Sequence, residues 1–93
     1  MIRLNCFFKA NSDEGFAAAL EAAKALTEKS RKHEGNVAYD VFASATRPDV
    51  FTIIETWKDQ EVLDKHSATP EFAEYVGIIQ NNGQLKIERF DFK

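Results

Sequence analysis

The chain has 93 residues, of which 44% are hydrophobic and 29% are charged, and its formal net charge is -3. This length fits one small domain over residues 1–93 and excludes a multidomain enzyme, while the composition excludes a disordered or membrane-embedded chain. The 12 Lys and Arg residues are spread among 15 Asp and Glu residues without a basic run, which excludes a nucleic-acid-binding surface.

The cysteine count and the N-terminal segment indicate a cytoplasmic protein. Cys6 has no second cysteine to form a disulfide with, and the chain has only two histidines, so we expect no structural zinc, no other bound metal and no haem. The first ten residues have no long apolar core and no small-residue cleavage site. We therefore expect neither a signal peptide nor a transmembrane span.

Alternating apolar residues predict a first strand over residues 2–8. Asn5 lies on its mixed face. The opposite face is wholly apolar and consists of Ile2, Leu4, Cys6 and Phe8. An amide in such a strand needs a hydrogen-bond partner, so Asn5 is either bonded within the fold or holds a substrate oxygen or molecular oxygen.

A long helix is predicted next. Residues 11–13 supply N-cap candidates, the helix runs to about residue 32, and the Gly35-Asn36 pair ends it. Charges of alternating sign on its outer side are typical of a solvated face. His33 lies near the C-terminus of this helix, and a favourable interaction with the helix dipole explains it without a functional role.

Two strands follow, over residues 37–45 and 50–58, and a tight turn joins them in an antiparallel hairpin. Glu55 and Trp57 lie on the same face of the second strand, since side chains two positions apart on a strand point the same way. Glu55 is therefore an acid among apolar neighbours, and burial of an unpaired carboxylate is costly, so we expect it to have a partner. Tyr39, on the first strand of the hairpin, is a candidate for a pocket wall.

Two helices are predicted after the hairpin. The first begins after Asp59 and turns His66 toward the apolar side of the helix. The second begins at Thr69-Pro70 and carries Phe72 and Tyr75 in its apolar stripe. The strand and the two helices should converge on one pocket.

A polar loop over residues 80–84 leads to a last strand over residues 85–92. The order of elements is β-α-β-β-α-β with the second α split in two, which predicts an α+β, ferredoxin-like antiparallel sheet with helices on one face. Both faces of the strands carry apolar residues. We therefore expect two sheets to pack face to face in a homodimer, with the stripe of Ile2, Leu4 and Cys6 near or within the interface.

The segment 55–72, ETWKDQEVLDKHSATPEF, contains a Glu-x-Trp pair, a His nine residues after the Trp, and then Thr-Pro and an aromatic residue. It resembles the antibiotic biosynthesis monooxygenase family of dimeric α+β barrels, and the resemblance covers essentially the whole chain. The family includes cofactor-independent oxygenases of quinols and anthrones, haem-degrading enzymes, and an isomerase of a small signalling sugar phosphate. The resemblance therefore implies a set of reactions and not one substrate.

The resemblance also implies roles for individual residues. Family oxygenases and haem degraders often use an Asn on the first strand and a Trp on the third, and Asn5 and Trp57 occupy such positions. The motif His corresponds to His66. In haem degraders the iron-binding His lies further along the helical segment, where this chain has Glu71 to Tyr75.

Two classes of function are compatible with these residues. The first is a monooxygenase that oxidises a quinol or related electron-rich aromatic with molecular oxygen and needs no cofactor, because a deprotonated phenol can itself give an electron to oxygen. The second is a non-enzymatic small-molecule binding module with the same pocket; an isomerase of a sugar phosphate and a haem-degrading relative also remain open. The candidate catalytic residues are Asn5, Glu55, Trp57 and His66. The candidate substrate-binding residues are Tyr39, Phe72 and Tyr75.

A specific hypothesis concerns Glu55 and His66. Glu55 is either a core acid satisfied by other donors or a site residue that accepts a hydrogen bond from one nitrogen of His66 and fixes the other nitrogen toward the pocket. In the second case the carboxylate raises the pKa of His66, since it favours the protonated ring.

Overall fold

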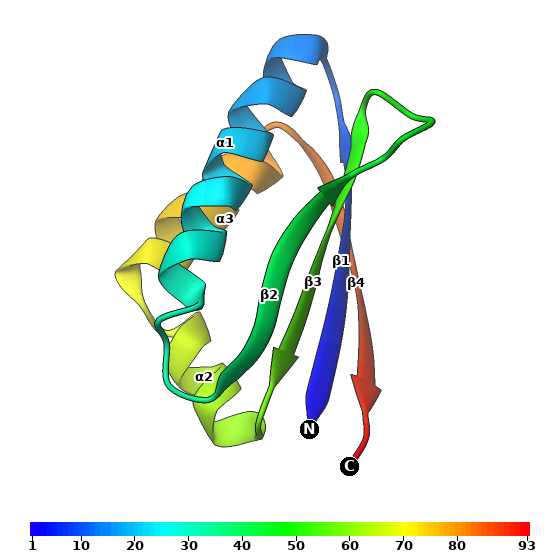
Figure 1. The fold of residues 1–93 in the computed structure, drawn as a ribbon. Helices are drawn as coiled ribbons and strands as arrows, with labels where there is room; N and C mark the ends of the chain where they lie inside the picture. Colours follow the sequence, from blue (N-terminus) through cyan, green and yellow to red (C-terminus); the bar gives the residue numbers. More distant parts are fainter.

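The computed structural model describes all residues from 1 to 93 and contains four strands and three helices (Figure 1). Their order is β1 (Ile2–Ala10), α1 (Asp13–Ser30), β2 (Asn36–Ala43), β3 (Val50–Trp57), α2 (Gln60–Ser67), α3 (Pro70–Asn81) and β4 (Gly83–Asp91). The strands form one antiparallel sheet in the order β2-β3-β1-β4, and the helices cover one of its faces (Figure 1). The predicted ferredoxin-like α+β arrangement is confirmed.

Side-chain caps start all three helices. Ser12 Oγ accepts a hydrogen bond from the Gly15 amide at 2.9 Å, and Asp59 Oδ1 accepts one from the Val62 amide at 3.0 Å. At the start of α3, Thr69 Oγ1 accepts from the Phe72 amide at 3.2 Å. These bonds satisfy backbone donors that the first turn of a helix leaves free.

The turn between α1 and β2 packs directly on α2. Helix α1 ends at Ser30, slightly earlier than expected, and Gly35 has a φ of 78°, a conformation that favours glycine. A Cβ at Gly35 would lie only 2.4 Å from a methyl carbon of Val62 on α2. The turn therefore lies so close to α2 that no side chain fits at Gly35. His33 belongs to the same turn.

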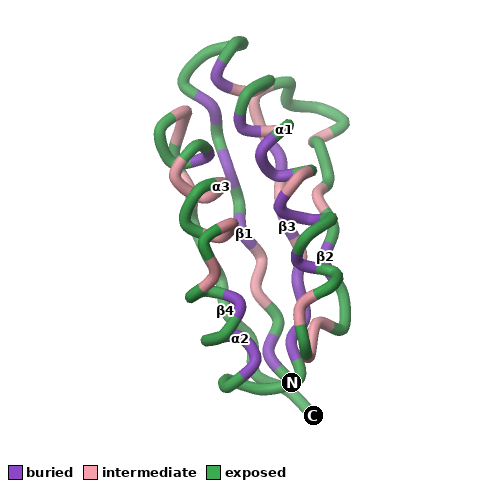
Figure 2. Tube along the Cα trace, turned by 90° about the vertical axis from the view of Figure 1, so that its left-hand side faces the viewer, coloured by how far each residue is buried: buried purple, intermediate pink, exposed green.

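The core lies between the sheet and the helices. It combines residues of β1 and β3 with small and apolar residues of α1, and burial is concentrated there, whereas β4 has no buried residue (Figure 2). Ile2 and Cys6 are only 4% and 6% exposed within this core, and Leu4 packs against it. The expectation that this stripe lies near or within a dimer interface is therefore wrong, because the helices of the same chain already cover it.

The opposite face of the sheet has no helix over it. Register pairs Phe7 with Thr52 and Lys86, and Asn5 with Ile54 and Glu88, so these residues share the uncovered face. Four phenylalanines are at least 41% exposed. They are Phe7, Phe42, Phe90 and Phe92.

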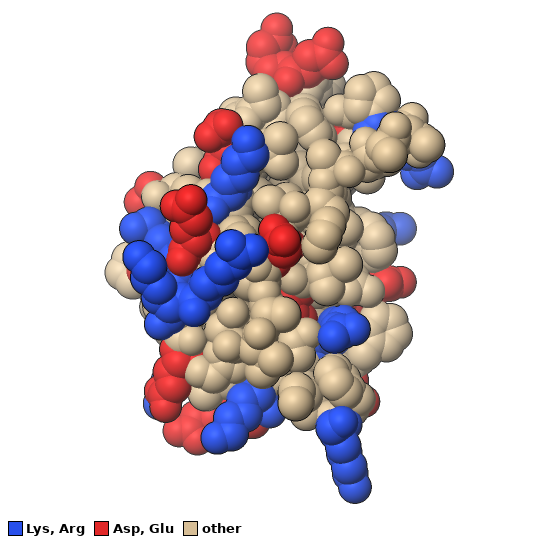
Figure 3. All heavy atoms as spheres, viewed as in Figure 1, with Lys and Arg blue, Asp and Glu red and all other residues tan.

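The two ends of the chain lie close together at one end of the neighbouring strands β1 and β4 (Figure 1). The Phe92 amide donates to the Met1 carbonyl at 2.9 Å, and the Met1 amino group donates to the Phe92 carbonyl. Positive and negative side chains alternate over the helical side (Figure 3), as the pattern of α1 predicts. None of the three helices has the length and hydropathy required to cross a membrane.

Candidate active site

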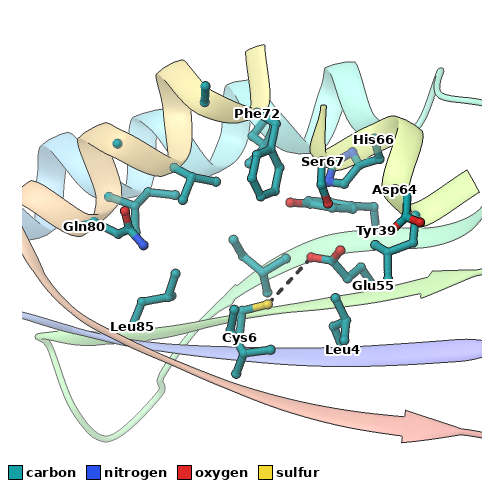
Figure 4. A pocket seen from close by; sticks show the side chains of 18 of the residues that line it. Leu4, Cys6, Tyr39, Glu55, Asp64, His66, Ser67, Phe72, Gln80 and Leu85 are labelled. Carbon is teal, nitrogen blue, oxygen red and sulfur yellow. Dashed lines mark hydrogen bonds between the residues drawn. The ribbon is translucent and has the colours of Figure 1, made fainter. Parts of the chain in front are cut away.

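A cavity of about 550 Å³ lies between the sheet and helices α2 and α3 (Figure 4). Twelve of its 19 lining residues are hydrophobic, and its polar groups include Tyr39, Glu55 and His66. Ile87 on β4 also lines the cavity and is 59% exposed. The cavity therefore reaches solvent beside this strand.

Glu55 is buried on the floor of the cavity, with 5% of its surface exposed. Its Oε1 accepts a hydrogen bond from Trp57 Nε1 at 2.8 Å, and its Oε2 faces Cys6 Sγ at 3.7 Å (Figure 4). Burial raises the pKa of Glu55, and hydrogen bonds from Trp57, Cys6 and Tyr39 oppose that rise. The environment thus disfavours the carboxylate relative to the same group in water.

Cys6 and Tyr39 flank Glu55 on the two neighbouring strands, and Tyr39 lies directly opposite it in the sheet register. Burial, followed by the charge of Glu55, raises the pKa of the Cys6 thiol and the pKa of the Tyr39 phenol. Both groups therefore keep their protons at neutral pH. They act as hydrogen-bond donors and not as nucleophiles.

His66 is 1% exposed and is enclosed by aromatic rings. Its centroid lies 4.3 Å from that of Trp57, 5.1 Å from Phe72 and 5.9 Å from Tyr39. The pKa of His66 is lowered to about 4, chiefly by burial and then by the charge of His33, while Glu71 opposes the shift. His66 is therefore neutral at pH 7, and its Nε2 has no hydrogen-bond partner in the protein.

The predicted hydrogen bond between Glu55 and His66 is not formed. Glu55 is occupied by Trp57 and Cys6, whereas Nδ1 of His66 lies 2.9 Å from Nδ1 of His33. The predicted rise of the His66 pKa is also wrong, because burial dominates and Glu55 is not among the groups that shift it. A Trp two residues along the same strand is simply the nearer donor.

Sequence reasoning missed His33. Its Nδ1 lies 2.9 Å from His66, and its Nε2 lies 3.0 Å from Glu71 Oε2 on α3. The interpretation of His33 as a residue that serves only the end of α1 is wrong, since both ring nitrogens are engaged elsewhere. The available signal was that the chain has only two histidines, one of them in the motif.

The remaining candidates divide between the two faces of the sheet. Tyr39 and Phe72 line the cavity. Trp57 is fully buried behind His66, and Tyr75 packs against the core without lining the cavity. Asn5 lies on the uncovered face with a buried Oδ1 that has no partner, so it does not line the cavity that Glu55 and His66 line.

The sequence model of antibiotic biosynthesis monooxygenases matches residues 1–77, a segment that contains Tyr39, Glu55 and His66. The chain belongs to the antibiotic biosynthesis monooxygenase family. A Bacillus subtilis (strain 168) protein named Putative monooxygenase YcnE is 32% identical over 76 residues, which are 82% of this chain and 79% of that protein.

Solved structures agree with this membership of the antibiotic biosynthesis monooxygenase family. A protein of Bacteroides thetaiotaomicron VPI-5482, called a possible oxidoreductase, is 53% identical with a TM-score of 0.93, and the match covers 98% of this chain and 96% of that one. The crystal structure of an antibiotic biosynthesis monooxygenase is 27% identical with a TM-score of 0.89, covering 100% and 99% of the two chains.

Proposed function

We propose that the protein is a monooxygenase that oxidises a quinol or a related electron-rich phenol with molecular oxygen and without a cofactor. The observation that carries this proposal is His66: a buried, neutral imidazole whose Nε2 has no protein partner lines a mostly apolar cavity. Such a nitrogen is suited to take a proton from a bound hydroxyl group. The names of YcnE and of the Bacteroides protein support an oxidative reaction.

The reaction begins with transfer of a phenolic proton to His66. The resulting phenolate is electron-rich enough to reduce molecular oxygen, and one oxygen atom is then added to the ring. One quinol and one O₂ give one hydroxyquinone and one water, so the aromatic substrate supplies all four electrons. No external reductant is needed.

The other polar groups of the cavity suit the second hydroxyl of a quinol. Glu55 and Tyr39 line the same space from neighbouring strands (Figure 4) and present hydrogen-bonding groups to it. Phe72, at the helical side, offers an aromatic face for ring packing. In this proposal Trp57 supports His66 and Glu55 from behind and does not touch the substrate.

The charge of the cavity favours a neutral aromatic substrate over an anionic one. Its ionisable lining residues other than the Cys6 thiol and the Tyr39 phenol are Glu55, Asp64 and His66, and it has no Lys or Arg. A sugar phosphate would find no Lys or Arg side chain in the lining to pair with. The carboxylates of haem would meet the same difficulty.

A homodimer is part of the proposal. The four exposed phenylalanines lie on or beside the sheet face that has no helix over it, and a second copy of the chain would bury them. A cytoplasmic location stays a prediction from the sequence.

Oxygen consumption with a series of hydroquinones tests the proposal. The wild-type protein should consume one O₂ per quinol and place one ¹⁸O atom from ¹⁸O₂ in the product, and His66→Ala should lower kcat by about 100- to 10,000-fold. Lys65→Ala, on the exposed side of the same helix, is the matched control and should retain the wild-type rate. Quinol binding without oxygen consumption would identify a binding module instead.

A further inference from the structure

The side chains of Glu71, His33 and His66 form one continuous chain of hydrogen bonds. Glu71 Oε2 lies 3.0 Å from His33 Nε2, and His33 Nδ1 lies 2.9 Å from His66 Nδ1. The chain starts at a partly exposed carboxylate on α3, passes through the turn after α1, and ends on α2 at the buried Nε2 of His66. It therefore links a partly exposed carboxylate to a residue that lines the cavity.

Building on the proposed function, we propose that these three side chains are a proton relay that carries the substrate proton from the cavity to His33 and thereby converts Nε2 of His66 from a hydrogen-bond acceptor into a donor. Glu71 and His33 act through His66 and are positioning residues.

The direction of these hydrogen bonds in the protein without substrate follows from which groups can donate and which can accept. An ionised carboxylate can only accept, so His33 carries its proton on Nε2. Neutral His33 then has a lone pair on Nδ1, and the short Nδ1 to Nδ1 contact requires His66 to donate from its own Nδ1. Nε2 of neutral His66, the nitrogen without a protein partner, therefore carries a lone pair and is the basic nitrogen of the ring.

Arrival of one proton at His66 reverses the direction of the hydrogen bond between His66 and His33. When Nε2 of His66 takes the phenolic proton, His66 can pass its Nδ1 proton to Nδ1 of His33 along the existing hydrogen bond. His66 is then neutral again with its proton on Nε2, and His33 carries the positive charge. One proton has left the substrate and one positive charge has appeared on His33, so the step is balanced.

The surroundings favour the charge at His33 over His66. The side chain of His33 is 16% exposed and contacts Glu71, whereas His66 is enclosed by aromatic rings. Lys29 is the cation that acts on Glu71 from α1. The neighbouring acid Glu34 is exposed and pairs with Lys65 at 3.3 Å, outside the relay.

The reversed hydrogen bond between His66 and His33 serves the second half of the reaction. A phenolate that has reduced O₂ yields a peroxide anion on the ring, and a neutral N–H donor at Nε2 of His66 can stabilise that anion. If the anion takes the Nε2 proton, the proton on Nδ1 of His33 returns to His66. The relay is then ready for the next substrate.

The direction of the hydrogen bonds from Glu71 through His33 to His66 can be measured without any substrate. In ¹⁵N-labelled protein at pH 7.5, correlation spectra of the imidazole nitrogens should show His66 protonated on Nδ1 and His33 on Nε2. His33→Asn should keep the His66 proton on Nδ1, because the amide oxygen takes the place of the accepting nitrogen. His33→Phe removes the acceptor and should move the His66 proton to Nε2.

Kinetics test whether the chain moves protons. His33→Asn should lower kcat for quinol oxidation by at least about tenfold with little change in KM, since it orients His66 but cannot take a proton. Glu71→Gln should lower kcat in the same way, because an amide does not stabilise a charged His33. Glu34→Gln removes the same charge one residue from His33 and should have no effect.

The outcomes separate the two proposals. A His66 proton on Nε2 in the wild-type protein, or a wild-type kcat in His33→Asn, would overturn the relay while leaving the monooxygenase intact. A wild-type protein that oxidises no quinol would overturn the proposed function, and the imidazole spectra would still decide the direction of the chain.

Discussion

Nδ1 of His33 and Nδ1 of His66 lie 2.9 Å apart, although the two residues are 33 positions apart in the sequence. Two ring nitrogens at this distance form a hydrogen bond only when one of them carries a hydrogen. The protonation states of the two rings are therefore interdependent. Because Glu71 occupies the far side of His33, a change of protonation at Glu71 bears on the ring of His66, a residue that lines the cavity.

His66 makes the fold sensitive to mild acid. Its pKa is lowered from the usual 6.5 to about 4 in the folded protein, so between these pH values the unfolded chain binds more protons than the folded one. Stability should therefore fall as the pH drops from 6.5 to 4, by about 2 to 3 kcal/mol from this residue. Urea unfolding of wild-type protein and His66→Leu between pH 4 and 8 measures the difference. If the unfolding free energy changed with pH equally in both proteins, the pH dependence could not be assigned to His66.

Glu55 should have the opposite effect. Its folded-state pKa is raised by burial, so the folded protein binds more protons than the unfolded chain above the usual pKa, and stability falls as the pH rises. Glu55→Gln keeps an acceptor for Trp57 Nε1 and removes the ionisation, so the variant should be more stable than wild type at pH 8 by about 1 to 2 kcal/mol. Glu21→Gln, an exposed acid on α1, is the control and should show no such gain. Thermal unfolding at pH 5 and pH 8 decides the matter, and an equal or lower stability of Glu55→Gln at pH 8 would refute it.

Gly35 should tolerate no side chain. Gly35→Ala places a Cβ at a φ of 78° and within 2.6 Å of three side-chain carbons of Val62, which should cost about 2 to 4 kcal/mol. Gly77→Ala is the matched change inside α3, where a Cβ meets nothing within 4 Å, and it should stabilise the protein by up to about 1 kcal/mol. Chemical denaturation of both variants gives the two free energies, and the same sign for both would rule out this account.

A charge on the uncovered sheet face should separate the proposed homodimer. Phe7 is 42% exposed on the central strand β1 and lies opposite Lys86 in the register. Phe7→Glu can pair with Lys86 in one chain but meets its own copy across a two-fold interface, so the dimer Kd should rise by at least about 100-fold. Ile78→Glu, exposed on α3, should leave the dimer unchanged. Light scattering over a concentration series measures both, and a wild-type protein that is already a monomer would end the homodimer proposal.

The fold was predictable because its signals are local. Ser12, Asp59 and Thr69 each cap a helix that their own neighbours begin, and alternation along β1 and β3 separates the apolar stripes from the mixed ones. Even the position of Asn5 was available from this pattern. The wholly apolar stripe of β1 is the one that helices cover, so the mixed stripe with Asn5 had to face away.

The site was predictable only in part because its polar contacts are not local. Trp57 contacts both Glu55 and His66, as their spacing on a strand and the following helix indicates, but it does not line the cavity. The relay depends instead on three segments that meet only in the folded chain, and nothing near His33 in the sequence indicates that the turn after α1 rests on α2 and α3. The close approach of Gly35 to Val62 brings this turn against α2, and it is visible only in the folded chain.

Trp57 is the only tryptophan of the chain, its ring lies against His66, and its Nε1 donates to Glu55. The fluorescence of an indole falls when an imidazole in contact with it becomes charged. The protein therefore contains its own optical reporter of proton transfer at His66, at a position that the substrate does not touch. A stopped-flow fluorimeter can follow this event in unlabelled protein and can time it against oxygen consumption.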